Sequence, residues 1–240
     1  MSAEEVGHIG FFPVTNSFIT TVIISLLLIC FAFYMKRTLR IAPTRLQTAS
    51  ELVIEGFYNL NTQIAGKRAA FIFPWFATFF LFILLANWFG LLPGVGTIGF
   101  FKAHHFVPML RPVNSDLNTT LSLALISLGL THFFSVKTLG IKEYLGRFFS
   151  LHPINLFVGI LELISEFTKI ASLSFRLFGN IFAGEALLST IATLSPFTAF
   201  LVPLPFMVLE IVVGVVQALV FSMLTLVFMV ILSTSYKEGH

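Results

Sequence analysis

The chain has 240 residues, of which 57% are hydrophobic and 10% are charged, and its mean hydropathy is +0.95. This composition lies far outside soluble-domain usage, so it excludes a soluble globular protein and predicts a polytopic integral membrane protein of one domain, residues 1–240. The net charge of +3 is small, and the single cysteine, Cys30, excludes a disulfide framework and a thiolate metal site.

The first predicted element is a membrane helix at residues 18–35, an uncharged run just long enough to cross a bilayer. After a cluster of basic residues, Thr44 and Gln47 have the spacing of a capping box, which predicts a helix start. In residues 44–66 the apolar side chains recur on one helical face, while acidic and amide side chains lie elsewhere. That pattern is typical of an amphipathic surface helix and not of a membrane span.

Two further membrane helices are predicted at residues 69–92 and 117–136. Asn87 is the polar exception in the first of them. The second opens at Asp116 and carries His132 in its apolar run.

The loop between these two helices contains adjacent histidines, His104 and His105. A metal site would need a third ligand, so a solvated loop is the favoured interpretation. We therefore expect neither a metal nor a cofactor.

Residues 154–193 contain no proline and no cluster of turn residues, which predicts one long helix, or two coaxial pieces that meet near Gly179. At ~1.5 Å per residue it is about 60 Å long, whereas the hydrocarbon core is ~30 Å thick, so the helix should be strongly tilted. An uncharged turn leads to a last span at residues 206–235, which should tilt as well. The expected fold class is an all-α integral membrane protein. It would have about five membrane-crossing helices and an amphipathic surface helix, the last two crossings forming a long, strongly tilted hairpin.

Ionisable and amide residues gather on one narrow face of the long helix. They are Glu162, Glu166, Lys169, Arg176 and Asn180, with Ser165 beside them and Glu185 on roughly the opposite face. Lys169 has Glu166 one turn back as a partner, but no acid lies one turn from Arg176. A guanidinium at membrane depth keeps its proton and is costly alone, so its counter-charge must come from a distant part of the chain or from another protein. The alternative is a structural arginine that reaches the headgroups, which would not need a whole polar face.

The last span repeats the pattern, because Glu210, Gly214 and Gln217 share one helical face. Antiparallel pairing with the long helix would bring Glu185 near Glu210 and Arg176 near Gln217. Two polar pockets would then open toward opposite sides of the membrane, separated by a fixed positive charge, as a gated proton or cation path requires. Either acid alone could instead be a packed, protonated side chain.

The basic residues indicate how the chain is oriented. Ten lysines and arginines fall on one side of the predicted spans, and only Lys102 and Arg111 fall on the other. The positive-inside rule then places the N-terminus outside and the C-terminus in the cytoplasm, or on the equivalent side of an organelle. The sequence shows no repeat at a fixed period, so it lacks the inverted-repeat signature of many secondary transporters.

The run SLSFRLFGNIFAGE at residues 172–185, with Glu162 fourteen positions before its arginine, resembles subunit a of the rotary F-type ATP synthases. Gln217, the DLN opening of the third span and the LLANWFGLLPG run that ends the second are similar to that family as well. The resemblance covers nearly the whole chain from about Phe18. The V-type family uses an analogous arginine, but on a much longer chain.

The resemblance implies a stator ion-channel subunit of the membrane sector of ATP synthase, with no catalytic site of its own. It implies as partners a ring of c subunits, b-type peripheral stalk subunits, the whole ATP synthase complex and membrane lipid, with no nucleic acid. A bacterial plasma membrane is favoured over an organellar energy-coupling membrane. Arg176 would face each ring carboxylate in turn, between two offset half-channels.

The resemblance also assigns residues to those half-channels. The outer one would contain Glu185, Glu210, Asn180 and Gln217. Asp116 and His132 are further candidates for it, although a capping aspartate and a core histidine explain them nearly as well. The cytoplasmic one would contain Glu162, Ser165 and Glu166.

Two other classes of protein compete with this interpretation. A subunit of a cation/proton antiporter would predict an internal repeat and usually more spans. An integral membrane enzyme would need a metal–carboxylate cluster, a nucleophile elbow or paired aspartates at an aqueous face. The sequence contains none of these patterns.

Overall fold

A computed structural model of the chain describes residues 5–9, 12–39, 43–92, 95, 99–102, 105–148, 153–194 and 202–234. The helices are α1 (Asn16–Thr38), α2 (Arg45–Ala65), α3 (Ala69–Gly90), α4 (Leu117–Leu139), α5 (Ile141–Phe148), α6 (Pro153–Leu194) and α8 (Pro203–Ser233). Two short 3-10 turns are η1 (Gly66–Arg68) and η2 (Val113–Ser115). The described chain is therefore mostly helical, which confirms the predicted fold class.

Four helical segments among the described residues are long and apolar enough to cross a membrane. They are Asn16–Thr38, Arg45–Gly90, Leu117–Leu139 and Pro203–Ser233. The predicted tilted helix is present as α6, which continues unbroken through Gly179 for 42 residues. Its length at ~1.5 Å per residue is about 63 Å, twice what an upright crossing needs.

Local sequence explains where several helices begin and end. Thr44 caps α2, because its Oγ1 accepts a hydrogen bond from the Gln47 N–H at 3.4 Å, as the spacing predicts. Asp116 caps α4 in the same way, accepting from the Asn118 N–H at 3.1 Å. Helices α2 and α4 end at Gly66 and Gly140, whose φ angles of 54° and 82° suit glycine and few other residues.

Other elements were not predicted. The basic segment after α4 forms the short helix α5, and two antiparallel hairpins pair β1 (Glu5–Ile9) with β2 (Phe12–Thr15) and β3 (Gly99–Lys102) with β4 (His105–Pro108). His104, one of the two candidate metal ligands, lies outside the described residues, as do residues 195–201 of the predicted turn. Helix α8 begins at Pro203, three residues before the predicted start of the last span at residue 206. Pro203 and Pro205 fit there because the N–H groups of a first helical turn have no partner.

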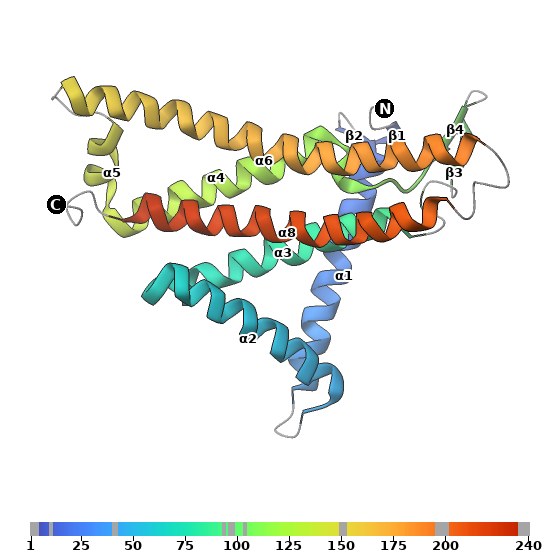
Figure 1. Ribbon diagram of the computed structural model, residues 1–240, viewed down its shortest axis with the longest axis horizontal. Coiled ribbons are helices and arrows are strands. Elements are labelled where there is room, and N and C mark those ends of the chain that lie inside the picture. The colour runs from blue at the N-terminus through green and yellow to red at the C-terminus, as the bar shows by residue number, and fades with distance from the viewer. Residues whose placement is uncertain are drawn as a thin grey trace.

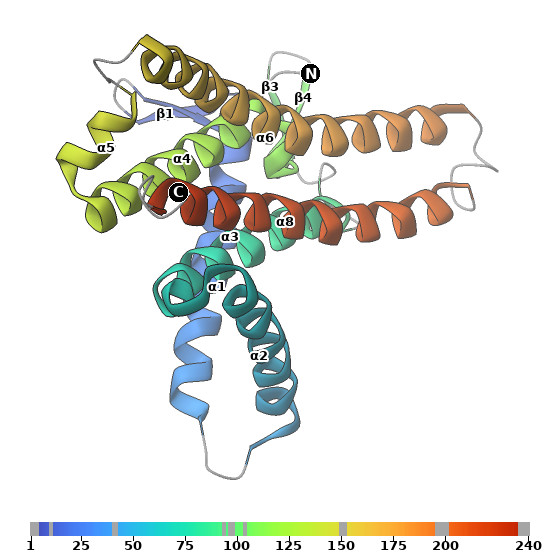
Figure 2. The ribbon, with the colours of Figure 1, turned by 60° about the vertical axis from the view of Figure 1, so that its left-hand side comes forward.

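The long helices α3, α4, α6 and α8 pack side by side, and α6 runs antiparallel to α8 (Figures 1 and 2). Helix α1 lies across them in both views. A 23-residue helix such as α1 is just long enough to cross a bilayer upright. If α1 does so, α6 and α8 are strongly tilted.

Aromatic and aliphatic side chains hold the bundle together. Phe76 and Phe221 are fully or nearly fully buried between α3 and α8, and Leu177 joins them from α6. Hydroxyl pairs add contacts between helices: Ser127 with Thr225 at 2.7 Å joins α4 to α8. Such small polar pairs let membrane helices approach closely, so α8 is held in a defined register beside α4.

Candidate ion pathway along α6 and α8

Arg176 projects from α6 with an exposed side chain. Its Nη2 donates to the hydroxyl of Ser172 at 3.2 Å, one helical turn back. Among the described residues, no acidic side chain forms an ion pair with this guanidinium. The positive charge is therefore presented to whatever lies against this face of α6.

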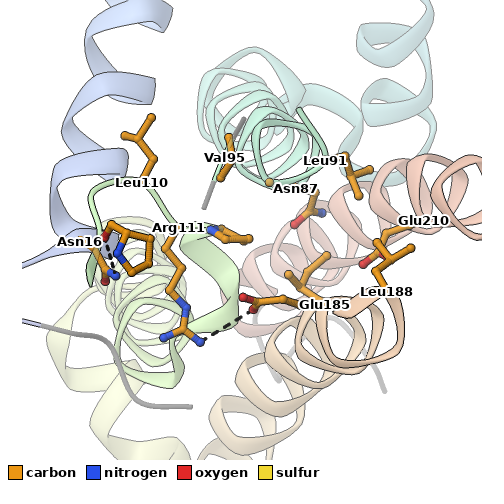
Figure 3. Close-up of a pocket in the computed structure, with 13 residues that line it drawn as sticks. Asn16, Asn87, Leu91, Val95, Leu110, Arg111, Glu185, Leu188 and Glu210 are labelled. Carbon is orange, nitrogen blue, oxygen red and sulfur yellow. Dashed lines mark hydrogen bonds and ion pairs between the residues drawn. The ribbon is translucent and has the colours of Figure 1, made fainter. Parts of the chain in front are cut away.

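One cavity of about 450 Å³ lies on the C-terminal side of Arg176 along α6, and we call it the Glu185 cavity (Figure 3). Its walls come from α6, α8, the end of α3, the start of α1 and the segment before η2. The polar side chains that line it are Asn16, Asn87, Arg111, Glu185 and Glu210. Helices α6 and α8 thus bring together the two acids that the antiparallel pairing predicted.

The two acids of the Glu185 cavity have different neighbours. The Nη2 of Arg111 lies 3.8 Å from Oε2 of Glu185, and that oxygen is buried without a hydrogen-bond partner among the described groups. The carboxylate of Glu210, which is 8% exposed, lies against Gly184, the residue before Glu185. The cavity thus contains two carboxylates and one guanidinium.

An amide network forms the wall of the Glu185 cavity beside α3. Asn87 donates from Nδ2 to the Gly214 carbonyl at 3.1 Å and accepts at Oδ1 from Asn114 Nδ2 at 2.6 Å. Gly214 has no side chain, which permits this approach, since a Cβ there would lie 3.1 Å from the Cβ of Asn87. The network joins α3, α8 and η2 next to Glu210.

Asn180 and Gln217 connect the two helices between the acids and Arg176. Asn180 Nδ2 donates to Gln217 Oε1 at 2.8 Å, from α6 to α8. Gln217 is 5% exposed, so this bond bridges the inside of the hairpin. Asn180 lies one helical turn from Arg176, which makes the pair the nearest polar link between that arginine and the Glu185 cavity.

A second cavity, of about 350 Å³, lies on the N-terminal side of Arg176, and we call it the Glu166 cavity. It is mostly apolar, with His132 from α4, Tyr144 from α5 and Glu166 from α6 as its polar side chains. Glu166 is 6% exposed and forms an ion pair with Lys169 at 2.7 Å, as the spacing predicted. Its other oxygen lies 3.8 Å from Nε2 of His132, whose Nδ1 is 2.9 Å from the Tyr144 hydroxyl.

His132 is therefore not where the resemblance implied. It was grouped with Glu185 and Glu210, but it lies against Glu166 in the other cavity. The reason is the direction of α4: His132 lies toward the C-terminal end of that helix, which packs on the N-terminal half of α6. Asp116, at the opposite end of α4, forms a cap.

Two other candidates lie on the same stretch of α6 as Glu166. Glu162 is half-buried one turn before it, and Ser165 is exposed beside it. Neither is among the residues that line the Glu166 cavity.

Sequence reasoning missed Arg111 and Asn114 as site residues. Arg111 was counted as a loop cation, yet it is 6% exposed. No local pattern distinguishes a buried arginine from a solvated one in a loop between two spans. Asn87, an isolated polar residue in an apolar run, was the sequence feature that could have indicated a buried amide network that includes Asn114.

The fold and the site together define an integral membrane protein built for ion translocation, with an exposed arginine between two acid-containing cavities on a tilted helical hairpin. The family model for the ATP synthase A chain matches residues 17–230. The ATP synthase subunit a of Moorella thermoacetica is 33% identical over 236 residues, which cover 98% of this chain and 97% of that protein. The ATP synthase subunit a of Geotalea daltonii is 35% identical over 224 residues, which cover 92% and 87%. The chain belongs to the ATP synthase A chain family.

This membership confirms the resemblance seen in the sequence. The chain is thus a proton-translocating, non-catalytic stator subunit of the membrane sector of ATP synthase. Nothing in the comparisons favours the antiporter or the membrane enzyme.

Proposed function

We propose that Arg176 meets the carboxylates of a rotating ring of c subunits, and that the two cavities are the half-channels on either side of it. Protons would enter through the Glu185 cavity, load the ring carboxylate, and leave by the Glu166 cavity after a rotation. The permanently charged guanidinium would prevent a direct leak from one cavity to the other. This scheme uses each polar cluster on the α6–α8 hairpin.

The observation that carries the proposal is the position of Arg176. It is exposed, it has no acidic partner among the described residues, and it lies between Ile170 of one cavity and Ile181 of the other. These two residues are separated by about 16 Å along the helix axis. A carboxylate supplied by a ring would neutralise the guanidinium, with an attraction of roughly 4 kcal/mol at ~4 Å and an effective dielectric of ~20.

The surface around Arg176 suits a partner made of apolar helices. Phe175, the residue next to Arg176 on α6, is 59% exposed. On α8, Val212 and Val216 are likewise exposed. Such an apolar face in a membrane protein suits either lipid or another helix, and the embedded arginine favours a ring that carries carboxylates.

Each half-channel has an assigned set of groups in this proposal. In the outer one, Glu185 and Glu210 relay the proton, and the Asn180–Gln217 pair guides it toward Arg176. In the cytoplasmic one, Glu166 and His132 form the relay, with Glu162 and Ser165 at its mouth. Asp116 has no part in the proposed proton path and serves as the N-cap of α4.

We further propose a single membrane domain in a bacterial plasma membrane, with the N-terminus outside, the C-terminus in the cytoplasm, and b-type stalk subunits as neighbours. The excess of basic residues on one side of the predicted spans supports the orientation. The bacterial origin of the relatives supports the location. Membership in the ATP synthase family supports the stalk.

Replacement of Arg176 tests the central step. Arg176→Ala should reduce ATP-driven proton pumping by inverted membrane vesicles to background, because no fixed positive charge then prevents protons from leaking directly between the two half-channels. The amount of the chain in the membrane, measured by immunoblot, should stay at the wild-type level, since the side chain is exposed. Arg45→Ala, which removes an exposed arginine from α2, is the matched control and should pump normally. Normal pumping by Arg176→Ala would refute the proposal.

Disulfide cross-linking tests the partner directly. Cys30, the only cysteine, is first replaced by serine. Cysteines at the exposed positions 172 and 175 should then cross-link to cysteines in the ring-helix of a co-expressed c subunit. Cysteines at the buried positions 173 and 177 should not. Equal cross-linking at all four positions, or at none, would contradict a ring against this face.

A further inference from the structure

A second arginine, Arg111, is buried in the wall of the Glu185 cavity, and the proton path proposed above gives it no role. Its side chain enters the cavity from the segment before η2 and ends at Glu185, as Figure 3 shows. It is 6% exposed, far less than Arg176 on the outer face of α6. A buried guanidinium at this place is costly unless it is held and paired.

Two anchors fix Arg111 in position. Its Nε donates to the Ser115 hydroxyl at 3.1 Å, and its backbone N–H donates to the Thr20 hydroxyl at 3.3 Å. Ser115 belongs to η2 and Thr20 to α1, so the arginine is tied to two elements on the side of the cavity opposite α6. The guanidinium is therefore a built-in part of the cavity wall.

Without this charge, the Glu185 cavity would have the chemistry of a cation site. Glu185 and Glu210 would place two carboxylates in one cavity of about 450 Å³, together with the amide of Asn16. Hard cations such as Ca²⁺ bind to sets of carboxylate and carbonyl oxygens, completed by water. A cation bound there would occupy the oxygens that a proton relay needs.

We propose that Arg111 is a specificity-determining residue of this cavity, because its fixed guanidinium supplies the counter-charge that a metal cation would otherwise supply. A proton can pass between carboxylates and water through hydrogen bonds, whereas a metal cation needs several oxygen ligands at once and is repelled by the guanidinium. The inference rests on the proposed function, since it assumes that the Glu185 cavity conducts protons.

The experiment uses the whole ATP synthase complex reconstituted in liposomes with its ATP-forming head outward, so that the proposed outer half-channel faces the lumen. Lumenal Ca²⁺ is set during reconstitution at zero or about 1 mM, a concentration that fills weak all-oxygen sites. Ca²⁺ outside is removed with a chelator. ATP synthesis is driven by an imposed proton gradient, and the result is the ratio of the rates with and without Ca²⁺ for each enzyme.

The wild type should give a ratio near one. Arg111→Gln should give a ratio that is about tenfold lower, as expected for a site that Ca²⁺ occupies to about nine-tenths. Arg111→Lys, which keeps a positive charge, should resemble the wild type. The double variant Arg111→Gln/Glu185→Gln should also resemble the wild type, because one carboxylate alone holds Ca²⁺ poorly.

The proposal is overturned if Arg111→Gln is as insensitive to Ca²⁺ as the wild type, or if the double variant is as sensitive as the single one. A merely structural role for Arg111 would not produce the recovery in the double variant. If Arg111→Gln does not accumulate in the membrane, Arg111→Met takes its place, since it also removes the charge and keeps a long unbranched side chain. It should show the same loss in the presence of Ca²⁺, and a ratio near one would overturn the proposal.

Two reference variants separate this inference from the proposed function. Glu185→Gln and Glu210→Gln, measured without Ca²⁺, should both synthesise ATP more slowly than the wild type. Wild-type rates in both would remove the Glu185 cavity from the proton path. Slow rates in both, together with a Ca²⁺-insensitive Arg111→Gln, would overturn only the role of Arg111.

Discussion

At the scale of single residues, the two arginines of the site differ in burial and in what they face. Arg176 is exposed, with only the Ser172 hydroxyl bonded to it among the described contacts. Arg111 is buried and has an anion of the same chain 3.8 Å away. Because a guanidinium does not lose its proton, each is a permanent charge. The first is therefore available for the passing carboxylate proposed above, while the second has its partner within the chain.

Replacement of Asn87 should destabilise the protein. Its buried amide serves both Asn114 and the Gly214 carbonyl, and Asn87→Ala would leave these groups unpaired. A buried polar group left without its partner costs about 1–3 kcal/mol. The temperature at which the purified complex loses this chain should therefore fall. Asn59→Ala, at an exposed position of α2, should leave it unchanged. An unchanged temperature for both would show that the network is not structural.

Part of the site could be predicted residue by residue. The ion pair between Lys169 and Glu166 follows from helical periodicity, because the two residues lie one turn apart. The placement of Glu185 near Glu210 follows from the antiparallel pairing of the two long helices. Arg111 could not be found in this way. Its burial depends on α1, η2 and α6 meeting around it, which no local pattern encodes.

At the scale of elements, glycines allow side chains of neighbouring helices to approach the backbones of α6 and α8 closely. Gly214 on α8 lets Asn87 of α3 approach, and Gly184 on α6 leaves room for the carboxylate of Glu210. Gly179, in contrast, has nothing within 4 Å of where its Cβ would be. Gly179 and Gly184 are therefore a matched pair for experiment.

Gly184→Ala should slow proton pumping several-fold, because its new Cβ would collide with the Glu210 carboxylate and push it aside. The carboxylate is the end of a flexible side chain, so the helices should still pack and the chain should still accumulate in the membrane. Alanine favours a helix more than glycine does, so helix propensity cannot explain a loss. Gly179→Ala should pump normally. Equal rates for both variants in inverted vesicles would show that the Glu210 position does not matter.

The helices were predictable as elements because long apolar runs and caps specify them, as at Thr44 and Asp116. The short helix α5 and the two hairpins were not. Strands of four or five residues carry too little periodic signal, and α5, with eight residues, is too short to be stable without packing on its neighbours. Its Tyr144 contacts His132, so the same omission hid one side of the Glu166 cavity.

At the scale of the whole molecule, the proposed function depends on the offset between the two cavities. They lie on either side of Arg176 along one continuous helix, and α1 lies across that helix (Figures 1 and 2). If α1 crosses the bilayer upright, α6 is strongly tilted. Two cavities separated along the axis of α6 are then separated mainly within the plane of the membrane. A rotary path requires two openings at different positions around the ring. On an upright helix, the two cavities would lie one above the other across the membrane.

The sides from which the cavities are reached should therefore differ, and single cysteines can test this. In a chain whose Cys30 is replaced by serine, Glu185→Cys should react with a small membrane-impermeant thiol reagent in intact cells but not in inverted vesicles. His132→Cys should behave in the opposite way, because it lines the Glu166 cavity. Leu173→Cys, buried on α6 and lining neither cavity, is the control that should react in neither preparation. Reaction of positions 132 and 185 from the same side would contradict two opposed half-channels. It would also return His132 to the group in which the resemblance placed it.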